Sequence, residues 1–265
     1  MTTVLDVLQF VETLAPRYMK MDFDNVGLLC GRKDKEVKKI LVALDPFQSV
    51  IEEAIEEKAD LIVTHHPLIY RDPPMAINED SQTGRNVLLL IENGIAAINA
   101  HTNLDQAPGG VNDVLAEAVG LRDIRVITPA GQDAEGRDWG LLHMGVRDEL
   151  PLEDFLSYVK EHLHCDGLRY VNGGKNVRTV AVGGGSCADG IYEALEAGCD
   201  TLVTSDVKYN QFRTAYEMGL NLIDAGHFHT ENPVMPVLAA KLQEAFPEVE
   251  VKFSEKHTDC MKFFR

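Results

Sequence analysis

The first periodic segment of the chain is an amphipathic stretch at its start. In residues 4–14 the apolar side chains recur every three or four positions, which places them on one face of a helix. Thr2 and Thr3 precede this stretch, and a threonine there can accept a hydrogen bond from the first helical turn. The pattern predicts a helix over residues 4–14 with a threonine cap.

Two short apolar runs follow, with a helical pattern between them. Residues 39–44 and 61–64 are almost wholly apolar, which is typical of strands buried on both faces of a parallel sheet. Residues 48–58 carry their apolar side chains on one helical face. Strand, helix and strand in this order predict a parallel βαβ unit, and therefore an α/β fold.

The same pattern recurs 140 positions later. Residues 42–64 align with residues 182–204 at this constant shift, so that Asp60 coincides with Asp200. Any two βαβ units share valines, alanines and glutamates, but a constant shift that also aligns the aspartates favours an internal duplication. The sequence therefore predicts two similar α/β lobes.

The limits of these lobes follow from the most polar, glycine-rich stretch of the chain. Residues 130–136 form that stretch, which is the expected junction. The first lobe is predicted to comprise residues 1–127 and 226–265, and the second lobe residues 128–225.

Composition and charge limit the classes of partner. The chain has 265 residues, and its 42 acidic against 25 basic residues give a net charge of −17. A field of this sign repels phosphate backbones, and no cluster of lysines and arginines offsets it, so nucleic-acid binding is not expected. No apolar run approaches the ~20 residues that a membrane helix needs. The start of the chain has no signal-peptide pattern, so a cytoplasmic protein is expected.

Five scattered cysteines complete the compositional picture. They form no C-x-x-C pair, and their number is odd. In a cytoplasmic chain we expect them to be small buried apolar residues and not a disulfide framework or a zinc ribbon.

Histidines and carboxylates gather where the predicted strands end. His65 and His66 directly follow the strand at residues 61–64, and two later strands are followed by a histidine and, four residues on, by a carboxylate. The candidate ligands are His65, His66, His101, Asp105, His227 and Glu231. Open α/β sheets bind their ligands at the carboxyl ends of strands. Imidazole and carboxylate without thiolate suit Zn²⁺, Mn²⁺ or Fe²⁺.

The number of candidate ligands favours two divalent ions over one. Asp105 and Glu231 are both candidates for the bridge between them. His65 and His66 are adjacent at a strand end, so their side chains are expected to diverge and to serve different ions. A lone histidine at a strand end is more often a hydrogen-bonded surface residue. Three matched placements favour the metal interpretation.

The remaining histidines and the glycine-rich segments are assigned to structural roles. His229 is an alternative to His227, which is preferred because it aligns with His101 at a shift of 126. Residues 183–186 lack the lysine of a phosphate-binding loop and predict a tight turn. Residues 109–113 predict a turn and a helix start. The other histidines are expected to be structural or exposed: His143, His162, His164 and His257.

Five motifs in their order along the chain resemble a known family. They are Asp24-Asn25-Val26-Gly27-Leu28, Thr64-His65-His66-Pro67-Leu68, the segment from His101 to Asp105, Gly109-Gly110-Val111-Asn112-Asp113, and the segment from Asp224 to Glu231. The set is similar to the NIF-three-like family, whose bacterial members are labelled type 2 GTP cyclohydrolase I homologues. The resemblance implies a two-lobed α/β fold, assembled as a toroidal homohexamer with dinuclear metal sites facing its interior.

The resemblance also implies a ligand set and an activity. The two divalent ions would be bound by five residues: His65, His66, Asp105, His227 and a bridging Glu231. His101 would lie beside the ions, where it can act as a general acid or base. The implied function is that of a metal-dependent hydrolase of a small purine-like or phosphorylated substrate. The alternative is a non-enzymatic metal-binding or regulatory scaffold built on the hexamer.

Overall fold

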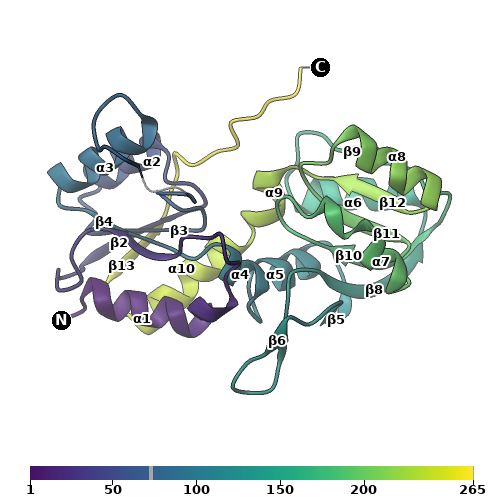
Figure 1. The fold of residues 1–265 in the computed structure, drawn as a ribbon, viewed down its shortest axis with the longest axis horizontal. Helices are drawn as coiled ribbons and strands as arrows, with labels where there is room; N and C mark the ends of the chain where they lie inside the picture. The colour runs from purple at the N-terminus through teal and green to yellow at the C-terminus, as the bar shows by residue number, and fades with distance from the viewer. Residues whose placement is uncertain (72–73, 265) are drawn as a thin grey trace. The chain divides into compact units, whose positions relative to one another are not determined.

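The computed structural model describes residues 1–71 and 74–264, and the chain forms two compact units. Unit 1 consists of Met1–Leu104 and Met235–Thr258, and unit 2 consists of Asp105–Val234 and Asp259–Arg265. Each unit has its own β-sheet with helices packed on it, which confirms the predicted α/β class (Figure 1). The lobe limits placed at residues 127 and 225 stay a prediction.

The sheet of unit 1 has five strands. Their order is β1 (Gly27–Cys30), β4 (Ala96–Asn99), β3 (Leu61–Thr64), β2 (Lys39–Ala43) and β13 (Glu250–Phe253). All neighbours are parallel except β1, which runs antiparallel to β4. The two apolar runs of the sequence form β2 and β3, and all four residues of β3 are buried. The carboxyl ends of β2, β3 and β4 therefore meet at one edge of the sheet.

Helices cover both faces of this sheet. Helices α2 (Gln48–Glu56) and α3 (Gln82–Glu92) lie on one face, and α1 (Val4–Leu14) and α10 (Val234–Ala245) lie on the other (Figure 1). The predicted cap of α1 is Thr3, whose hydroxyl accepts a hydrogen bond from the Asp6 backbone N–H. The short helices of this part of the chain are η1 (Arg17–Met19) and α4 (Thr102–Gln106), and α4 continues into unit 2.

The sheet of unit 2 has six strands. Their order is β5 (Arg122–Val126), β8 (His143–Leu150), β10 (Val177–Val182), β11 (Thr201–Thr204), β12 (Asn221–Asp224) and β9 (Arg169–Val171). Only β10, β11 and β12 are mutually parallel. The stretch 130–136 contributes to a hairpin of β6 (Gly131–Gln132) and β7 (Asp138–Trp139) within this unit.

Alternating side chains of the central strands face two different layers of helices. Val180 and Val182 pack in a core with α5 (Val111–Ala118) and α6 (Leu152–His162). Ala181, which lies between them in the sequence, packs in a second core with α7 (Ile191–Glu196) and α8 (Tyr209–Met218). The two remaining helices of unit 2 are η2 (Ala188–Gly190) and α9 (His227–Glu231).

A common plan recurs in the two units. The order β1-β4-β3-β2 in unit 1 corresponds to β9-β12-β11-β10 in unit 2, with one antiparallel edge strand in each case. The Asp60 carboxylate accepts hydrogen bonds from the backbone N–H groups of residues 38 and 39, and the Asp200 carboxylate accepts from those of residues 178 and 179. The aligned aspartates therefore tie together the same two strand starts. Duplication as the origin of this likeness stays a prediction.

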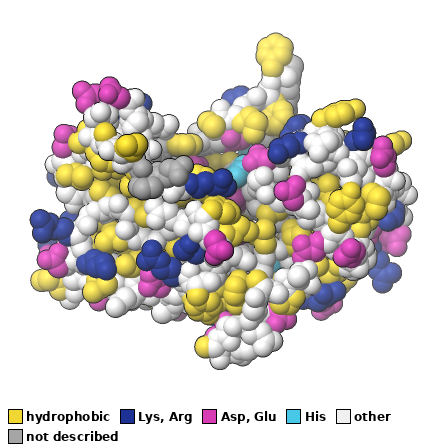
Figure 2. Space-filling model, viewed as in Figure 1, with side chains coloured by type: hydrophobic (Ala, Val, Ile, Leu, Met, Phe, Trp, Pro, Cys, Tyr) yellow, Lys and Arg dark blue, Asp and Glu magenta, His cyan; other side chains and the backbone are white. Residues whose placement is uncertain are grey.

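The structure tests the expectations that cysteines are buried and that no basic cluster is present. All five cysteines are free thiols; four are buried as expected, whereas Cys260 is exposed. On the face drawn in Figure 2, lysines and arginines lie among acidic side chains and form no continuous basic patch. Within residues 1–71 and 74–264, every helix is too short or too polar to span a membrane.

Candidate metal centre

Three histidines of unit 1 converge at the edge where β3 and β4 end. His65 and His66 follow β3, and His101 follows β4, its parallel neighbour. One ring nitrogen of each lies within 4.8 Å of those of the other two. The ring centroids are 5.0 Å apart for His65 and His66, and 5.2 and 5.5 Å from these two to His101. Adjacent histidines thus remain close enough to act together, and their assignment to different ions stays a prediction.

Each of these histidines is oriented by a hydrogen bond from its Nδ1 atom to an oxygen. The acceptors are the Ala100 carbonyl for His65 at 2.9 Å, Asp45 for His66 at 2.6 Å and Asp24 for His101 at 2.8 Å. Because an oxygen acceptor requires the proton on Nδ1, the neutral ring presents its lone pair on Nε2. This is the usual arrangement of metal-binding histidines.

The two supporting aspartates stay ionised for a local reason. Burial would raise the pKa of Asp45, but hydrogen bonds from His257 and His66 outweigh it and hold that pKa far below its ordinary value. The pKa of Asp24 is likewise held well below its ordinary value, because hydrogen bonds from His101 and Thr102 outweigh burial. Both carboxylates are therefore fixed negative charges behind the imidazoles.

Sequence reasoning missed three members of this arrangement. The sequence pattern places Asp24 only in a motif and assigns no role to Asp45. His257 was grouped with the structural or exposed histidines, but it is buried, and its Nε2 lies 3.1 Å from Asp45. The signal for Asp45 is its position two residues after the end of β2, the strand beside β3.

A second group lies in unit 2 and consists of Asp105, His227 and Glu231. His227 and Glu231 are the first and last residues of α9, one helical turn apart, and their Nε2 and Oε2 atoms are 3.1 Å apart. A carboxylate oxygen of Asp105 lies within 4.8 Å of one of Glu231. Both carboxylates are buried. The expected ligands of this part of the chain are thus brought together.

His227 lies between two carboxylates that favour its protonated form. Its Nδ1 donates to Asp206 at 2.7 Å. Burial would lower the pKa of His227, but the hydrogen bonds to Asp206 and Glu231 outweigh it and raise that pKa to about 11. A divalent cation at Nε2 would replace this proton while keeping the carboxylates balanced. The donor set of unit 2 therefore fits a divalent metal ion.

The glycine turn after β10 forms one wall of this group. Gly185 has φ of +62°, and a Cβ atom there would lie 2.1 Å from Glu231 Oε1 and 3.2 Å from His227 Nε2. The turn is fixed from two sides, because the Gly185 N–H donates to Thr230 Oγ1 at 3.0 Å and its carbonyl accepts from Ser205 Oγ at 2.7 Å. Glycine is required here for close approach to the ligand side chains.

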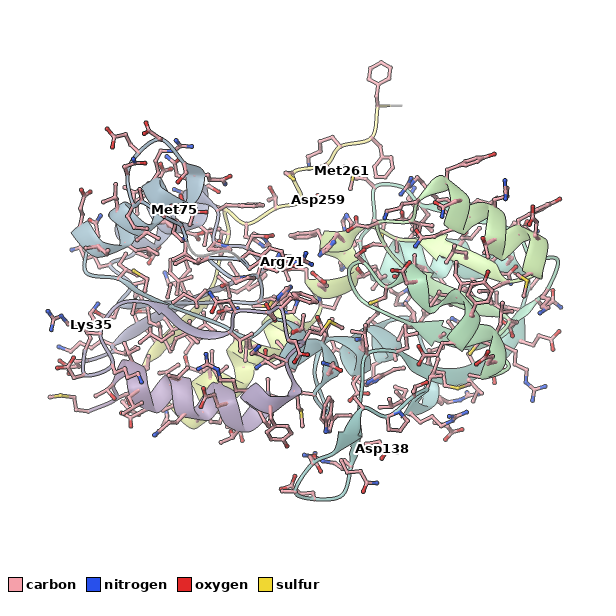
Figure 3. The ribbon with its side chains drawn as sticks, viewed as in Figure 1. Lys35, Arg71, Met75, Asp138, Asp259 and Met261 are labelled. Atoms are coloured by element: carbon pink, nitrogen blue, oxygen red, sulfur yellow. The ribbon has the colours of Figure 1, made fainter. Side chains whose placement is uncertain are left out.

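Two other histidines of unit 2, His229 and His143, are engaged elsewhere. His229, the alternative to His227, has its Nδ1 3.1 Å from the Leu163 carbonyl and its Nε2 3.2 Å from Asp259. Asp259 lies in the C-terminal segment (Figure 3). His143 is buried and donates to Asp113 at 2.8 Å. The structure thus places His227, and not His229, beside Glu231.

Comparison with known proteins identifies relatives over the whole chain. The family model for Duf34/NIF3 (NGG1p interacting factor 3) matches residues 2–260. A protein of Clostridium perfringens named GTP cyclohydrolase 1 type 2 homolog is 35% identical over 260 residues, covering 97% of this chain and 98% of that protein. A protein of the same name from Clostridium acetobutylicum is 33% identical over 265 residues, covering 98% of each.

A solved structure shows the same fold. The Bacillus cereus protein related to NIF3 matches with a TM-score of 0.93 and 28% sequence identity, covering 100% of this chain and 99% of that chain. The resemblance suggested by the five motifs is therefore confirmed by the whole-chain match to the family model and by the structural match.

Proposed function

Because the chain belongs to the Duf34/NIF3 family, we propose that it is a divalent-metal-binding protein that acts as a metal-dependent hydrolase on a small molecule. The observation that carries the proposal is the state of the histidines. In both units, histidines at strand ends have Nδ1 bound to an oxygen, so that Nε2 is the nitrogen offered for ligation.

The proposed ligands of two ions per chain are His65, His66, Asp105, His227 and Glu231. Glu231 is the proposed bridge, because a carboxylate has two oxygens and can serve two ions ~3.5–4 Å apart. Imidazole and carboxylate donors without thiolate favour Zn²⁺, Mn²⁺ or Fe²⁺. Divalent charge at this place also offers an anionic substrate a local attraction that the net charge of −17 does not.

The proposed chemistry divides between the metal and the protein. Bound divalent ions supply Lewis-acid activation of water near neutral pH. His101 is the proposed acid or base, since its hydrogen bond to Asp24 orients the ring. The relatives' name, GTP cyclohydrolase 1 type 2 homolog, supports a purine-like or phosphorylated substrate.

Metal analysis of two variants tests the ligand set. Glu231→Gln should lose at least one of the two ions, since the bridging carboxylate becomes a neutral amide. His101→Ala should keep both ions and lose turnover. Full metal content in Glu231→Gln, or metal loss confined to His101→Ala, contradicts the ligand set. Turnover of GTP or of generic phosphoesters, measured with and without chelator, separates the hydrolase from a non-enzymatic metal-binding scaffold.

We also propose a homohexameric assembly, which the family resemblance suggests. Tyr192, Tyr209 and Tyr216 of unit 2 are exposed, and exposed aromatic side chains are enriched in protein–protein interfaces. Light scattering at low micromolar concentration should give about six times the chain mass of 29.3 kDa. A mass near that of one chain contradicts the assembly.

A further inference from the structure

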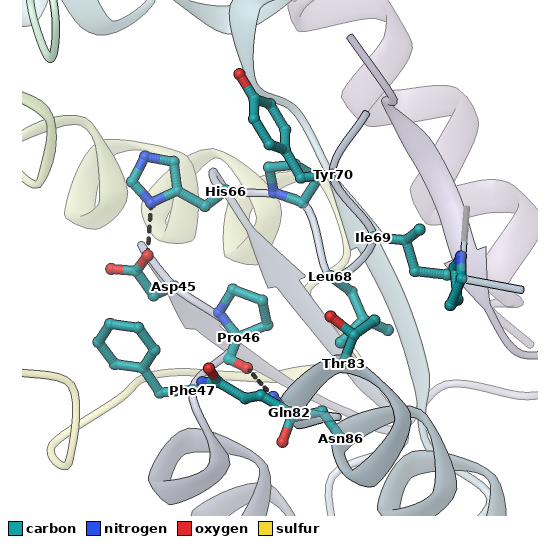
Figure 4. A pocket seen from close by; sticks show the side chains of 12 residues that line it. Asp45, Pro46, Phe47, His66, Leu68, Ile69, Tyr70, Gln82, Thr83 and Asn86 are labelled. Carbon is teal, nitrogen blue, oxygen red and sulfur yellow. Dashed lines mark hydrogen bonds and ion pairs between the residues drawn. The ribbon is translucent and has the colours of Figure 1, made fainter. Parts of the chain in front are cut away.

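A cavity of about 280 Å³ opens in unit 1 beside the three-histidine group (Figure 4). His66 and Asp45 lie on one side of it, and Gln82 and Thr83, the first residues of α3, lie on the other. We call this cavity the α3 pocket. Because His66 belongs to both, a molecule in the α3 pocket lies directly against a proposed metal ligand.

The walls of the α3 pocket combine apolar and polar side chains. Its apolar lining residues are Pro46, Phe47, Pro67, Leu68, Ile69, Tyr70 and Pro74. The Phe47 ring lies 6.0 Å from the ring of His257, and the Tyr70 ring lies 5.8 Å from that of His101. Both aromatic rings belong to the lining and offer apolar contact area to a planar ring in the pocket.

The charge of the lining favours a neutral occupant. Among its described residues there is no lysine or arginine. Its carboxylate, Asp45, is engaged by His66 and His257 on the side of the histidines. An anionic ring or a phosphate inside the pocket would meet this carboxylate and no lysine or arginine to balance it.

The start of α3 supplies a polar edge. The side chains of Gln82 and Thr83 make no hydrogen bond to any described part of the chain. A primary amide offers a donor and an acceptor, and a hydroxyl can serve as either. A cyclic amide presents an N–H and a carbonyl side by side in one plane, which matches this pair.

We propose that the α3 pocket binds the neutral, planar cyclic-amide ring of the substrate, with one edge against Gln82 and Thr83 and the other toward His66. The volume admits one or two fused rings, since sites for larger molecules occupy ~300–1,000 Å³. The inference rests on the proposed function, because it assigns the ring to the molecule that the metal-dependent hydrolase acts on.

Binding of two matched probes to chelator-treated protein tests the proposal. Hypoxanthine is a two-ring cyclic amide, and purine has the same rings without the carbonyl. Calorimetric titration should show hypoxanthine binding more tightly than purine. Thr83→Val keeps the shape and removes one hydroxyl, so it should weaken hypoxanthine binding by roughly 2- to 12-fold, the effect of one neutral hydrogen bond. Purine binding should not change.

Two further variants show whether the change in hypoxanthine binding arises in the α3 pocket. Gln82→Leu removes the second polar group and should act on hypoxanthine alone, as Thr83→Val does. Thr13→Val on the exposed face of α1 makes the same chemical change away from the pocket and should leave both probes unaffected. Equal affinity for the two probes, or Thr83→Val behaving like Thr13→Val, overturns the proposal.

The result is separate from that of the metal experiment. Because the titrations use chelator-treated protein, hypoxanthine binding does not depend on a bound ion. If Glu231→Gln keeps its full metal content while hypoxanthine distinguishes Thr83→Val from Thr13→Val, the ligand set is wrong and the ring site stands. If the metal results are as expected and the probes bind equally, only the ring site is wrong.

Discussion

Replacing Asn112 with alanine is expected to weaken metal binding as well as folding. This side chain is fully buried in unit 2 and makes three hydrogen bonds. Its Nδ2 donates to the carbonyls of Asp105 at 2.9 Å and Leu141 at 2.7 Å, and its Oδ1 accepts from the Gly184 N–H at 2.7 Å. It thus connects the backbone of one proposed ligand with the glycine turn that packs against Glu231.

The size of the effect follows from these contacts. Three buried backbone groups lose their partner, at about 1 kcal/mol each, so Asn112→Ala should lower the free energy of unfolding by about 3 kcal/mol. A domain stable by ~5–15 kcal/mol remains folded after this loss. Loss of the support around ligands typically lowers metal affinity by ~10–100-fold.

Asn221→Ala is a matched control in the same unit. Asn221 is also fully buried, accepts from the Gly173 N–H and donates to the Lys175 carbonyl and Thr201 Oγ1. Asn221→Ala should therefore lower the free energy of unfolding, measured by urea denaturation, by a similar amount and leave the metal affinity unchanged. Competition with a chromophoric chelator gives the affinity. Equal affinities in the two variants refute the positioning role of Asn112.

Two further changes have definite expected results. Gly185→Ala should reduce the metal affinity at least tenfold in the chelator competition, because the new Cβ atom collides with Glu231. Gly174→Ala is the control, since Gly174 has a similar φ of +79° and no atom lies near the position of its Cβ. This control should lower the free energy of unfolding by roughly 1 kcal/mol and leave the metal affinity unchanged. Asp60→Asn should destabilise the protein at pH 7 and lose this effect progressively at acidic pH. Burial would raise the pKa of Asp60, but the Lys38 N–H, the Lys35 ammonium and the Lys39 N–H together lower it. The contribution of the carboxylate to stability is therefore full above the unfolded pKa of about 4 and is lost as the pH falls through the folded pKa. Urea denaturation of both proteins across this range checks the sign, and a constant difference between them contradicts it.

Elements fixed by local pattern could be predicted from the sequence. The apolar runs at residues 39–44 and 61–64 form β2 and β3, since strands covered on both faces exclude polar residues. The helix expected over residues 48–58 ends at Glu56. Lys58 adopts φ of +55°, which no helix continues, and the apolar periodicity carries no sign of that backbone change.

The arrangement around His66 depends on a part of the chain far away in sequence. Strand β13 returns to pair with β2, and the segment after it carries His257 to Asp45, 212 positions from that residue. Local periodicity does not specify which strand a late segment joins. An isolated histidine near the end of the chain was therefore assigned to a structural or exposed role, although it completes the hydrogen bonding of a supporting carboxylate.

A rule that joins topology to chemistry would have found the supporting carboxylates. Asp45 follows β2 and accepts a hydrogen bond from His66, which follows β3. Asp24 precedes β1, the antiparallel neighbour of β4, and accepts from His101, which follows β4. Asp206 follows β11 and accepts from His227, which follows β12. In each case the acid comes from the strand next to that of the histidine, because neighbouring strand ends at one edge lie within reach of a hydrogen bond. A histidine at a strand end is therefore better judged as a ligand after the strand order is known, when the ends of its neighbours can be searched for an acid. Positions that align between the two units can have different roles. Asp206 aligns with His66 at the shift of 140. Asp206 accepts a hydrogen bond from a histidine, whereas His66 is the histidine that donates one, to Asp45.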